Sequence, residues 1–548
     1  MMLATWKRLW AMNDDVKGMF RLFTAPHEAD TVKGGGAGHP VGVNNEGGGK
    51  DSKSYTVTQL IGLIVGPALF FLIYFFFKPE DLSAEGVAIL ASTVWIATWW
   101  ITEALPIPVT SLMPLVLFPM TLGLDVKETA SAYGDENIFL FMGGFIIALA
   151  MEKWNLHRRI ALGIISVIGV TMDRIVLGFM VATGFLSMWI SNTATAMMMV
   201  PIGLAIIAQI SEAVKDDPTI DTSKENFKFG KALMLGIAYS ASVGGIATLI
   251  GTPPNTLLAG AISKIYGVEI TFAGWMMFGV PFAWTFIFVI WVYLTKFALK
   301  SEIKTLPGGK AVIHAEQKKL GKASYEEIMV FIVFITAAFA WITRSFLLQG
   351  FFPGLSDGVI AMIFAIVLFA IPSVNKKGDH LMDWNTAVQL PWGVLLLFGG
   401  GLAIAAGFKS SGLSEWIGSQ LGGLAGVHLF VLILAVATLI IFLTEITSNT
   451  ATASMMFPIM ASLSLALDVH PYSLMMAAAV AASCAFMLPV ATPPNAVVFG
   501  SGYLKIPDMA KAGFALNLFG ILLVTVCIYF LVPALWGIDL NVFPDAFK

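Results

Sequence analysis

Charge is scarce in this chain, and the shortage limits what the protein can be. Only 12% of its 548 residues are Asp, Glu, Lys or Arg, whereas 57% are hydrophobic, and the mean hydropathy is +0.81. A soluble domain usually carries about 25% charged residues. Apolar runs of about 18 or more residues, each long enough to cross a bilayer, recur from Val57 almost to the C-terminus. The sequence therefore excludes an ordinary soluble domain and predicts one polytopic membrane unit.

Cysteine, clustered histidine and clustered positive charge are also missing. Cys484 and Cys527 lie far apart in apolar runs, so a disulfide framework or a thiolate metal site has no basis. The seven histidines lack metal-ligand spacing. A formal net charge of −3 without a basic stripe argues against nucleic acid as a partner. No nucleophile stands with a base and no cofactor motif is present, so the sequence predicts that the protein is not an enzyme.

The ends of the chain and one connection give a predicted orientation. Residues 1–54, rich in glycine and charge, are predicted to form a flexible cytoplasmic tail, residues 55–535 the membrane domain, and residues 536–548 a short external end. Lysines gather in the connection 296–325, which the positive-inside rule places in the cytoplasm. Counting crossings from this connection puts the N-terminus inside and the C-terminus outside.

About eleven transmembrane helices and two re-entrant hairpins are predicted. The hairpins are 173–209 and 427–463, because each holds two apolar arms joined at a polar Ser-Asn-Thr. Polar breaks separate the other apolar stretches. The crossings are predicted near 57–77, 85–102, 106–122, 137–152, 232–265, 271–299, 326–348, 355–373, 387–407, 473–504 and 512–534.

The two hairpins are copies of one another. Residues 191–202 read SNTATAMMMVPI and residues 448–459 read SNTATASMMFPI, so ten of twelve positions agree. A Thr-Pro-Pro-Asn motif at 252–255 recurs at 492–495. Five crossings separate the equivalent helices, so the repeats are predicted to be inverted in the membrane, as in many secondary transporters. Their predicted bounds are about 85–265 and 326–504.

Both motifs are predicted to interrupt helices inside the membrane. A polar turn exposed to lipid would leave backbone groups unpaired at several kcal/mol each, so each Ser-Asn-Thr turn must line a protected cavity. Proline breaks a helix because it lacks an N–H group and clashes with the preceding turn. Freed carbonyls, hydroxyls and amide oxygens suit a small cation, whereas helix N-termini present N–H groups to an anion. Lys and Arg are absent from both motifs, so a bound anion would depend on co-bound cations.

A hydroxyl one helical turn before each motif is repeated as well. Ser187 lies four residues before Ser191, and Thr444 lies four residues before Ser448, which places each pair on one helix face. The alternative is that these hydroxyls bond to carbonyls of their own helix. Because the whole set is repeated, we interpret them as ion ligands.

Coupling to protons is the weaker alternative. It would need a carboxylate inside the membrane, and the candidates are Glu103 and Glu445. Glu445 has Met188 as its counterpart in the first repeat, so it breaks the symmetry. The simpler interpretation of each carboxylate is a group at a helix or hairpin end that accepts hydrogen bonds from local amides.

The paired motifs and the segment ITEALPIPVTSLMPLVLFP together resemble the divalent anion:sodium symporter family, especially its bacterial sodium-dependent dicarboxylate transporters. The resemblance covers about residues 57–535. It implies an all-α polytopic membrane protein that forms a homodimer. In that architecture a scaffold domain holds the dimer interface, and a transport domain with both hairpins and both broken helices moves like an elevator.

The resemblance also implies site residues. The first sodium site falls on Ser187, Ser191, Asn192 and the backbone around Gly251. The second falls on Thr444, Thr447, Asn449 and the backbone around Ala491. Substrate contacts fall on Asn192, Thr193, Thr252, Ser448, Asn449, Thr450 and Thr492. Since Ile190 is the counterpart of Thr447, the two sodium sites are not expected to be identical.

The predicted function is sodium-coupled import of four-carbon dicarboxylates such as succinate, fumarate and malate across the plasma membrane. Two or more Na⁺ ions are expected to be transported with each substrate molecule. A dicarboxylate exchanger, or a citrate or sulfate carrier on the same scaffold, is the first alternative. An anion channel is disfavoured, because closely paired ion and substrate ligands suit alternating access.

Overall fold

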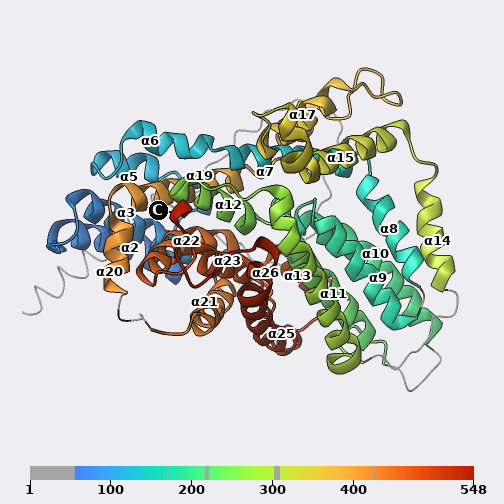
Figure 1. Cartoon of the computed structure of the whole chain (residues 1–548). Helices are drawn as coiled ribbons and strands as arrows, with labels where there is room; N and C mark the ends of the chain where they lie inside the picture. Colours follow the sequence, from blue (N-terminus) through green and yellow to red (C-terminus); the bar gives the residue numbers. More distant parts are fainter. Residues whose placement is uncertain are drawn as a thin grey trace, which may run out of the picture.

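The computed structural model describes residues 56–169, 171–215, 221–300, 309–421, 423 and 426–547. The predicted tail 1–54 lies outside these residues. Within the described part the protein is helical, and its only strand-like feature is an isolated bridge between Pro372 and His380. Figure 1 shows helices packed side by side along the whole molecule. The predicted all-helical membrane fold is confirmed.

The helices of the first half match most of the predicted apolar stretches. In chain order they are α2 (Val57–Phe76), α3 (Ala84–Thr102), α4 (Ile107–Thr110), α5 (Pro114–Met120), α6 (Val126–Ser131), α7 (Glu136–Lys153), α8 (Leu156–Ile168), α9 (Met172–Ser187), α10 (Asn192–Ala213), α11 (Lys228–Gly245), α12 (Pro253–Tyr266) and α13 (Phe272–Val292). The predicted crossing 106–122 is divided into α4 and α5. Prolines at the N-terminal end of each of these short helices explain the division.

The second half is built in the same way. Its helices are α14 (Gly309–Leu320), α15 (Tyr325–Thr343), α16 (Gln349–Phe351), α17 (Asp357–Ala370), α18 (Trp384–Ala387), α19 (Trp392–Ser410), α20 (Leu413–Gln420), α21 (Leu429–Thr444), α22 (Asn449–Ala466), α23 (Pro471–Ala482), α24 (Pro493–Phe499), α25 (Ile506–Val526) and α26 (Val532–Trp536). The predicted crossing 387–407 begins later, at Trp392, because Pro391 precedes the helix. Among the described residues, eight helical stretches are long and apolar enough to cross a membrane.

Capping side chains set where several long helices begin. Thr56 and Gln59 form a capping box at the start of α2, and Ser324 and Glu327 form another at the start of α15. The Ser83 hydroxyl accepts the Gly86 N–H at the start of α3. After the first turn, α2, α3 and α15 contain no charged residue, so no buried charge in them would need a partner inside the membrane.

The repeat extends beyond the motifs that identify it in the sequence. The helix order α7 to α13 recurs as α19 to α25. The short helices α8 and α20, which periodicity alone did not predict, begin at Leu156 and Leu413, and 413 − 156 = 257 is also the spacing of the Ser-Asn-Thr motifs. Each follows a left-handed residue, Asn155 with φ 58° and Gly412 with φ 73°. Equivalent connections therefore redirect the chain in both halves.

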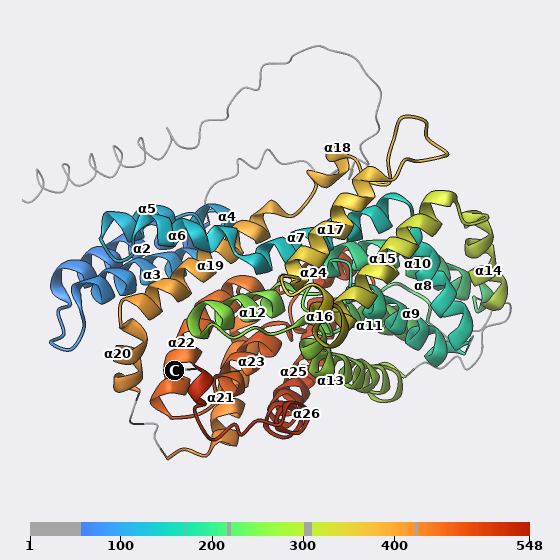
Figure 2. The same cartoon turned by 45° about the horizontal axis from the view of Figure 1, so that its top comes forward.

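The elements gather in groups that both views show. Helices α2, α3, α5 and α6 lie at one end of the molecule, and α8, α9, α10 and α14 lie at the other (Figures 1 and 2).

Glycines allow some of these helices to pack closely. A side chain on Gly143 of α7 would come within 2.7 Å of the Ala361 backbone in α17. A side chain on Gly400 of α19 would come within 2.6 Å of the Ser111 carbonyl oxygen.

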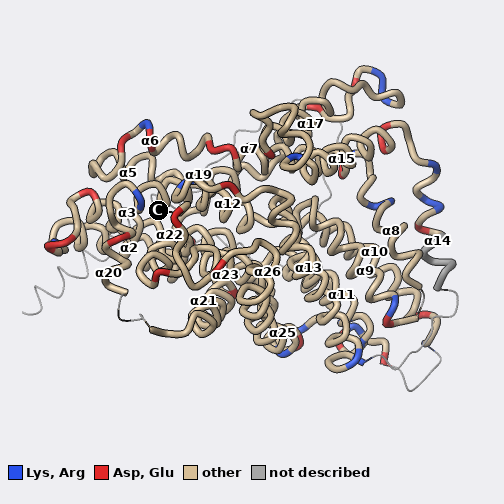
Figure 3. Tube along the Cα trace, viewed as in Figure 1, with Lys and Arg blue, Asp and Glu red and all other residues tan. Residues whose placement is uncertain are grey.

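Charged residues lie mainly at helix ends and in connections, and few interrupt the helical middles (Figure 3). Several pair across elements: Arg158 with Glu316 of α14 at 2.9 Å, and Arg159 with Glu327 at 3.0 Å. The first pair holds the described part of the lysine-rich connection against α8, and the second joins α8 to the start of α15. The distribution is the one expected of a chain whose helices lie in lipid.

Candidate functional site

The two Ser-Asn-Thr motifs lie at breaks between paired helices. α9 ends at Ser187 and α10 begins at Asn192, while α21 ends at Thr444 and α22 begins at Asn449. The Ser191 hydroxyl accepts the Ala194 N–H at 3.1 Å and so caps α10. The predicted pairs of helical arms joined at the motifs are confirmed.

The two Thr-Pro-Pro-Asn motifs also begin helices after a break. α12 begins at Pro253 and α24 at Pro493, the position at which proline's missing N–H costs nothing. The asparagine side chain of each motif donates a hydrogen bond to a backbone carbonyl in the non-helical segment that precedes the helix. Asn255 Nδ2 donates to Thr248 O at 2.7 Å, and Asn495 Nδ2 donates to Leu488 O at 3.0 Å. These amide nitrogens therefore stabilise the interrupted backbone.

One cavity of about 710 Å³ joins all four breaks. Helices α10, α12, α22 and α24 all begin at its wall, so four helix N-termini meet there. The predicted site residues that line it are Ser191, Asn192, Thr193, Gly251, Thr252, Thr447, Ser448, Asn449, Thr450, Ala491 and Thr492. The other two, Ser187 and Thr444, lie buried behind it and bond to residues that line it. All the residues predicted from two distant parts of the chain are thus brought together.

The buried hydroxyls make matching contacts in the two halves. Ser187 Oγ lies 2.5 Å from the side-chain amide of Asn192 and donates to Ala241 O at 2.6 Å. Thr444 Oγ1 makes the same pair of contacts, to Asn449 Oδ1 at 2.6 Å and Ala482 O at 3.1 Å. Both hydroxyls thus bond to a neighbouring helix, so the alternative of bonding within their own helix is wrong. The two carbonyls were missed because backbone groups carry no sequence signal.

The Asn192 amide lies in a group of oxygens. One terminal atom of this amide, at the position labelled Oδ1, lies 2.5 Å from Ser187 Oγ, 3.1 Å from Ala241 O and 3.2 Å from Gly251 O. The acceptors around this atom favour nitrogen there, so that the amide donates towards them and three oxygens surround it. A side chain at Gly245 would lie 2.7 Å from Asn192 Oδ1 and 2.8 Å from Gly251 O, so only glycine leaves this space open.

The rest of the cavity wall is mostly apolar and carries little charge. α7 contributes Phe141, Phe145 and one carboxylate, Glu152, and the end of α3 contributes a second carboxylate, Glu103. No Lys or Arg belongs to the lining among the described residues. An anion in this cavity would meet hydroxyls, amides and helix N-termini, and its charge would have to be balanced by cations.

Glu445 closes the break in the second repeat. Its carboxylate, 3% exposed, accepts the N–H groups of Phe486 at 2.7 Å, Met487 at 2.9 Å and Leu488 at 3.1 Å. Asn517 Nδ2 donates to it at 2.7 Å. Four donors therefore hold the charge of Glu445, in agreement with the interpretation of a carboxylate bound by local amides.

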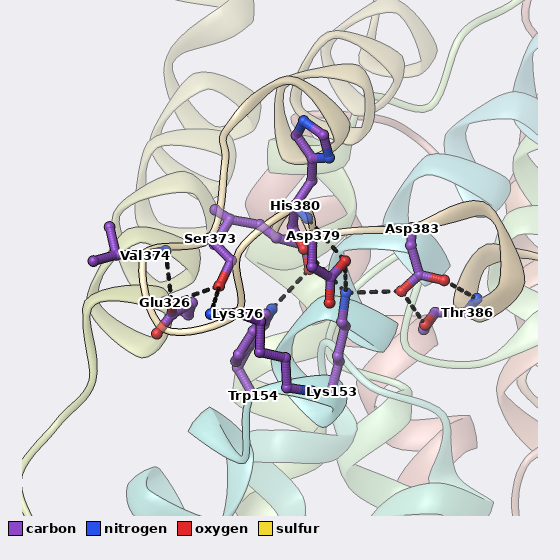
Figure 4. Close-up of polar contacts among 11 residues, drawn as sticks. Lys153, Trp154, Glu326, Ser373, Val374, Lys376, Asp379, His380, Asp383 and Thr386 are labelled. Atoms are coloured by element: carbon purple, nitrogen blue, oxygen red, sulfur yellow. Dashed lines mark hydrogen bonds and ion pairs between the residues drawn. The ribbon is translucent and has the colours of Figure 1, made fainter. Parts of the chain in front are cut away.

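A polar cluster outside the cavity holds the end of α7 in place (Figure 4). Lys153 Nζ lies 2.7 Å from Asp383 Oδ2, 3.2 Å from Asp379 Oδ1 and 3.0 Å from His380 O. The Lys153 hydrogen bond holds the pKa of the Asp383 carboxyl well below its usual range. Lys153 Nζ makes these three contacts outside the cavity, and Lys153 is not among the residues that line it.

The fold is that of a membrane transporter. It is similar to the YdaH transporter of Alcanivorax borkumensis, with a TM-score of 0.54 and 15% identity over 80% of this chain and 98% of that one. It is also similar to MtrF of Neisseria gonorrhoeae, with a TM-score of 0.51 and 12% identity over 90% of this chain and 96% of that one. At these identities the likeness shows the arrangement of helices.

Sequence comparison gives the family. Residues 57–541 match the sodium:sulfate symporter transmembrane region, and the chain belongs to this family. It is 52% identical over 496 residues to the sodium-dependent dicarboxylate transporter SdcS of Staphylococcus saprophyticus, covering 90% of this chain and 95% of that one. It is 50% identical over 495 residues to SdcS of Staphylococcus aureus, with the same coverage. The predicted family, and a membrane transporter rather than an enzyme, are confirmed.

Proposed function

We propose that this protein is a sodium-coupled symporter that imports four-carbon dicarboxylates, such as succinate, fumarate and malate, across the plasma membrane. The observation that carries the proposal is the cavity at which four interrupted helices meet and whose lining, among the residues that the structure describes, contains no Lys or Arg. The dicarboxylate specificity named for the SdcS relatives supports it. Neutral donors alone hold a dianion weakly, so cation and substrate must bind together.

Sodium ions would be bound by the two oxygen groups. The first takes Ser187, Ser191, Asn192 and Gly251, and the second takes Thr444, Thr447, Asn449 and Ala491. The oxygens that surround the Asn192 amide, Ser187 Oγ, Ala241 O and Gly251 O, support the first assignment, because hard cations prefer such ligands. The Thr447 hydroxyl already contacts Leu443 O at 2.8 Å and Thr452 Oγ1 at 2.6 Å, which leaves its carbonyl for an ion. At least two Na⁺ ions per substrate follow from two such sites.

The two substrate carboxylates would be bound by the two hairpin tips. The residues assigned to this role are Asn192, Thr193, Thr252, Ser448, Asn449, Thr450 and Thr492. Each tip places a helix N-terminus at the cavity, where N–H groups and the helix dipole favour a negative charge. Two tips set a span, so a diacid of the right length can engage both.

Transport would follow an elevator mechanism in a homodimer, with the tips and broken helices moving against the rest of the membrane domain. We propose a cytoplasmic N-terminus and an external C-terminus, because lysines gather on the connection after α13. A cysteine placed at Lys505, in a background without Cys484 and Cys527, should then resist an impermeant thiol reagent added outside intact cells. Labelling of this cysteine would reverse the orientation.

Reconstituted protein gives the decisive test of function. Labelled succinate should enter proteoliposomes against its gradient only when a sodium gradient is imposed, and uptake should saturate. Unlabelled succinate, fumarate and malate should compete well. Butyrate should compete poorly, because it leaves one tip's buried donors unpaired at roughly 1–3 kcal/mol. Uptake without sodium, or stronger competition by sulfate or citrate, would contradict the proposal and favour the alternative carriers.

A further inference from the structure

Two buried serines near the broken helices leave their hydroxyls unused. Ser242 in α11 is 2% exposed and Ser483, just after α23, is 1% exposed. Neither hydroxyl has a hydrogen-bond partner among the described residues. An unpaired buried hydroxyl costs about 1–3 kcal/mol, so proteins rarely retain one without a reason.

Neighbouring serines show that these helices can satisfy a hydroxyl. Ser240, two residues before Ser242, donates to Gly236 O at 2.5 Å. Ser473, in the same helix that precedes Ser483, donates to His470 O at 2.7 Å. Such bonds to the helix's own carbonyls are the usual solution for a buried serine. Ser242, within α11, and Ser483, directly after α23, do not follow this rule.

The two exceptions lie beside matching contacts in the two repeats. Each follows the residue whose carbonyl accepts the hydroxyl of Ser187 or Thr444, since Ala241 precedes Ser242 and Ala482 precedes Ser483. The two pairs are 241 residues apart, one more than the spacing of the Thr-Pro-Pro-Asn motifs, so they match in their contacts and not in exact sequence register. An unpaired hydroxyl next to the same carbonyl in both halves is better explained by a shared function than by accident.

Ser242 also lies where an ion would need it. It lines the cavity together with Asn192 and Gly251. It is one helical turn before Gly245, whose missing side chain leaves room for the Asn192 amide. Ser187 Oγ, Ala241 O and Gly251 O lie within 3.2 Å of the Asn192 amide, and such hard oxygens are the ligands that a small cation takes.

We propose that the hydroxyls of Ser242 and Ser483 are additional sodium ligands, one for each repeat. The inference rests on the proposed function and extends its ligand sets by one residue each. Both hydroxyls would remain unpaired until a cation is bound, which makes their burial a cost that ion binding offsets. The ligand is a small hard monovalent cation, Na⁺ or Li⁺.

Sodium-dependent thermal stabilisation of the purified full chain tests the proposal apart from transport. NaCl would be titrated against choline chloride at constant ionic strength, with wild type, Ser242→Ala, Ser242→Cys and Ser483→Ala compared. We expect the sodium concentration for half-maximal stabilisation to rise about tenfold in each variant, the loss of one ligand. Cysteine nearly preserves size and replaces the hard oxygen with soft sulfur, so it separates ligand chemistry from packing.

Ser240→Ala and Ser473→Ala are the matched controls, because their hydroxyls are buried but already bonded; sodium dependence should stay at the wild-type value. Without sodium, Ser242→Ala should melt at or above the wild-type temperature, since an unpaired group has been removed. Unchanged sodium dependence in Ser242→Ala or Ser483→Ala, or a lower melting temperature without sodium, would overturn the proposal. If wild type itself shows neither sodium stabilisation nor sodium-dependent uptake, the proposed function fails instead.

Discussion

The two repeats place matching residues at the cavity but support their breaks by different means. In the first repeat Thr248 Oγ1 donates to Met188 O at 2.5 Å and accepts the Gly251 N–H at 3.0 Å. In the second, Glu445 occupies the position equivalent to Met188 and accepts four N–H bonds instead. The face that lines the cavity is similar in the two repeats, whereas the supporting face differs. The proposed binding of ion and substrate would constrain the cavity-lining residues, whereas any set of satisfied hydrogen bonds can support the break.

Replacing Glu445 should give the largest effect and sharpen this comparison. Glu445→Ala would leave buried N–H groups of residues 486–488 and Asn517 without an acceptor, at about 1–3 kcal/mol each. We expect little folded protein. Thr248→Val, the corresponding change in the first repeat, should remain folded with a loss of roughly 1–3 kcal/mol. The measurements are the yield of monodisperse protein and its melting temperature, and equal values for the two variants would show that the supports are equivalent.

The sequence predicted the residues that line the cavity far better than the residues that support the breaks. The duplicated motifs identified Asn192 and Asn449, and with them the hydroxyls of Ser187 and Thr444, because the two copies can be recognised within the one sequence. The apolar runs likewise fixed most helices to within a few residues. This succeeds because lipid demands long uninterrupted apolar stretches.

The features that could not be predicted from the sequence are formed by backbone atoms, whose positions do not depend on a particular residue type. The carbonyls of Ala241 and Ala482 accept the two hydroxyls, yet alanine in an apolar helix predicts only packing. The helices α8 and α20 are short and lie between longer elements, so their periodicity is weak. Gly245 looked like an ordinary glycine until the structure placed it against Asn192.

The asparagines of the two tips test whether the matching faces are functionally equivalent. Asn192→Ala and Asn449→Ala should each nearly abolish uptake while leaving folded protein, because each amide is assigned to both a cation and the substrate. Sodium and succinate affinities should fall together, since linkage makes their coupling reciprocal. Sodium and succinate saturation curves in proteoliposomes measure both, with the exposed Asn226→Ala as control. A variant with weaker succinate affinity and unchanged sodium dependence would assign that asparagine to substrate alone.

The smallest expected effect concerns how the two equivalent helices α11 and α23 begin. Phe227 precedes α11 without a side-chain cap, whereas His470 caps α23 by accepting the Tyr472 N–H at 3.2 Å through Nδ1. Burial lowers the pKa of His470 to about 4, against about 6.5 in an unfolded chain. Below pH 6.5 the unfolded state therefore binds more protons than the folded state. Stability should be fully present above pH 6.5 and decline as the pH falls towards 4, by roughly 1–3 kcal/mol.

Melting temperatures of wild type and His470→Gln between pH 7.5 and 4.5 would isolate this contribution. Glutamine keeps an acceptor for the Tyr472 N–H but does not titrate, so its profile should be flatter than that of wild type over this range. His428, which is exposed and caps α21 through the same atom, provides the matched control as His428→Gln. Parallel profiles for wild type and His470→Gln would mean that the buried imidazole is not a source of pH sensitivity. In that case unfolding would not be accompanied by proton uptake at His470. The starts of α23 and α11 would then differ in their capping geometry but not in the pH dependence of their stability.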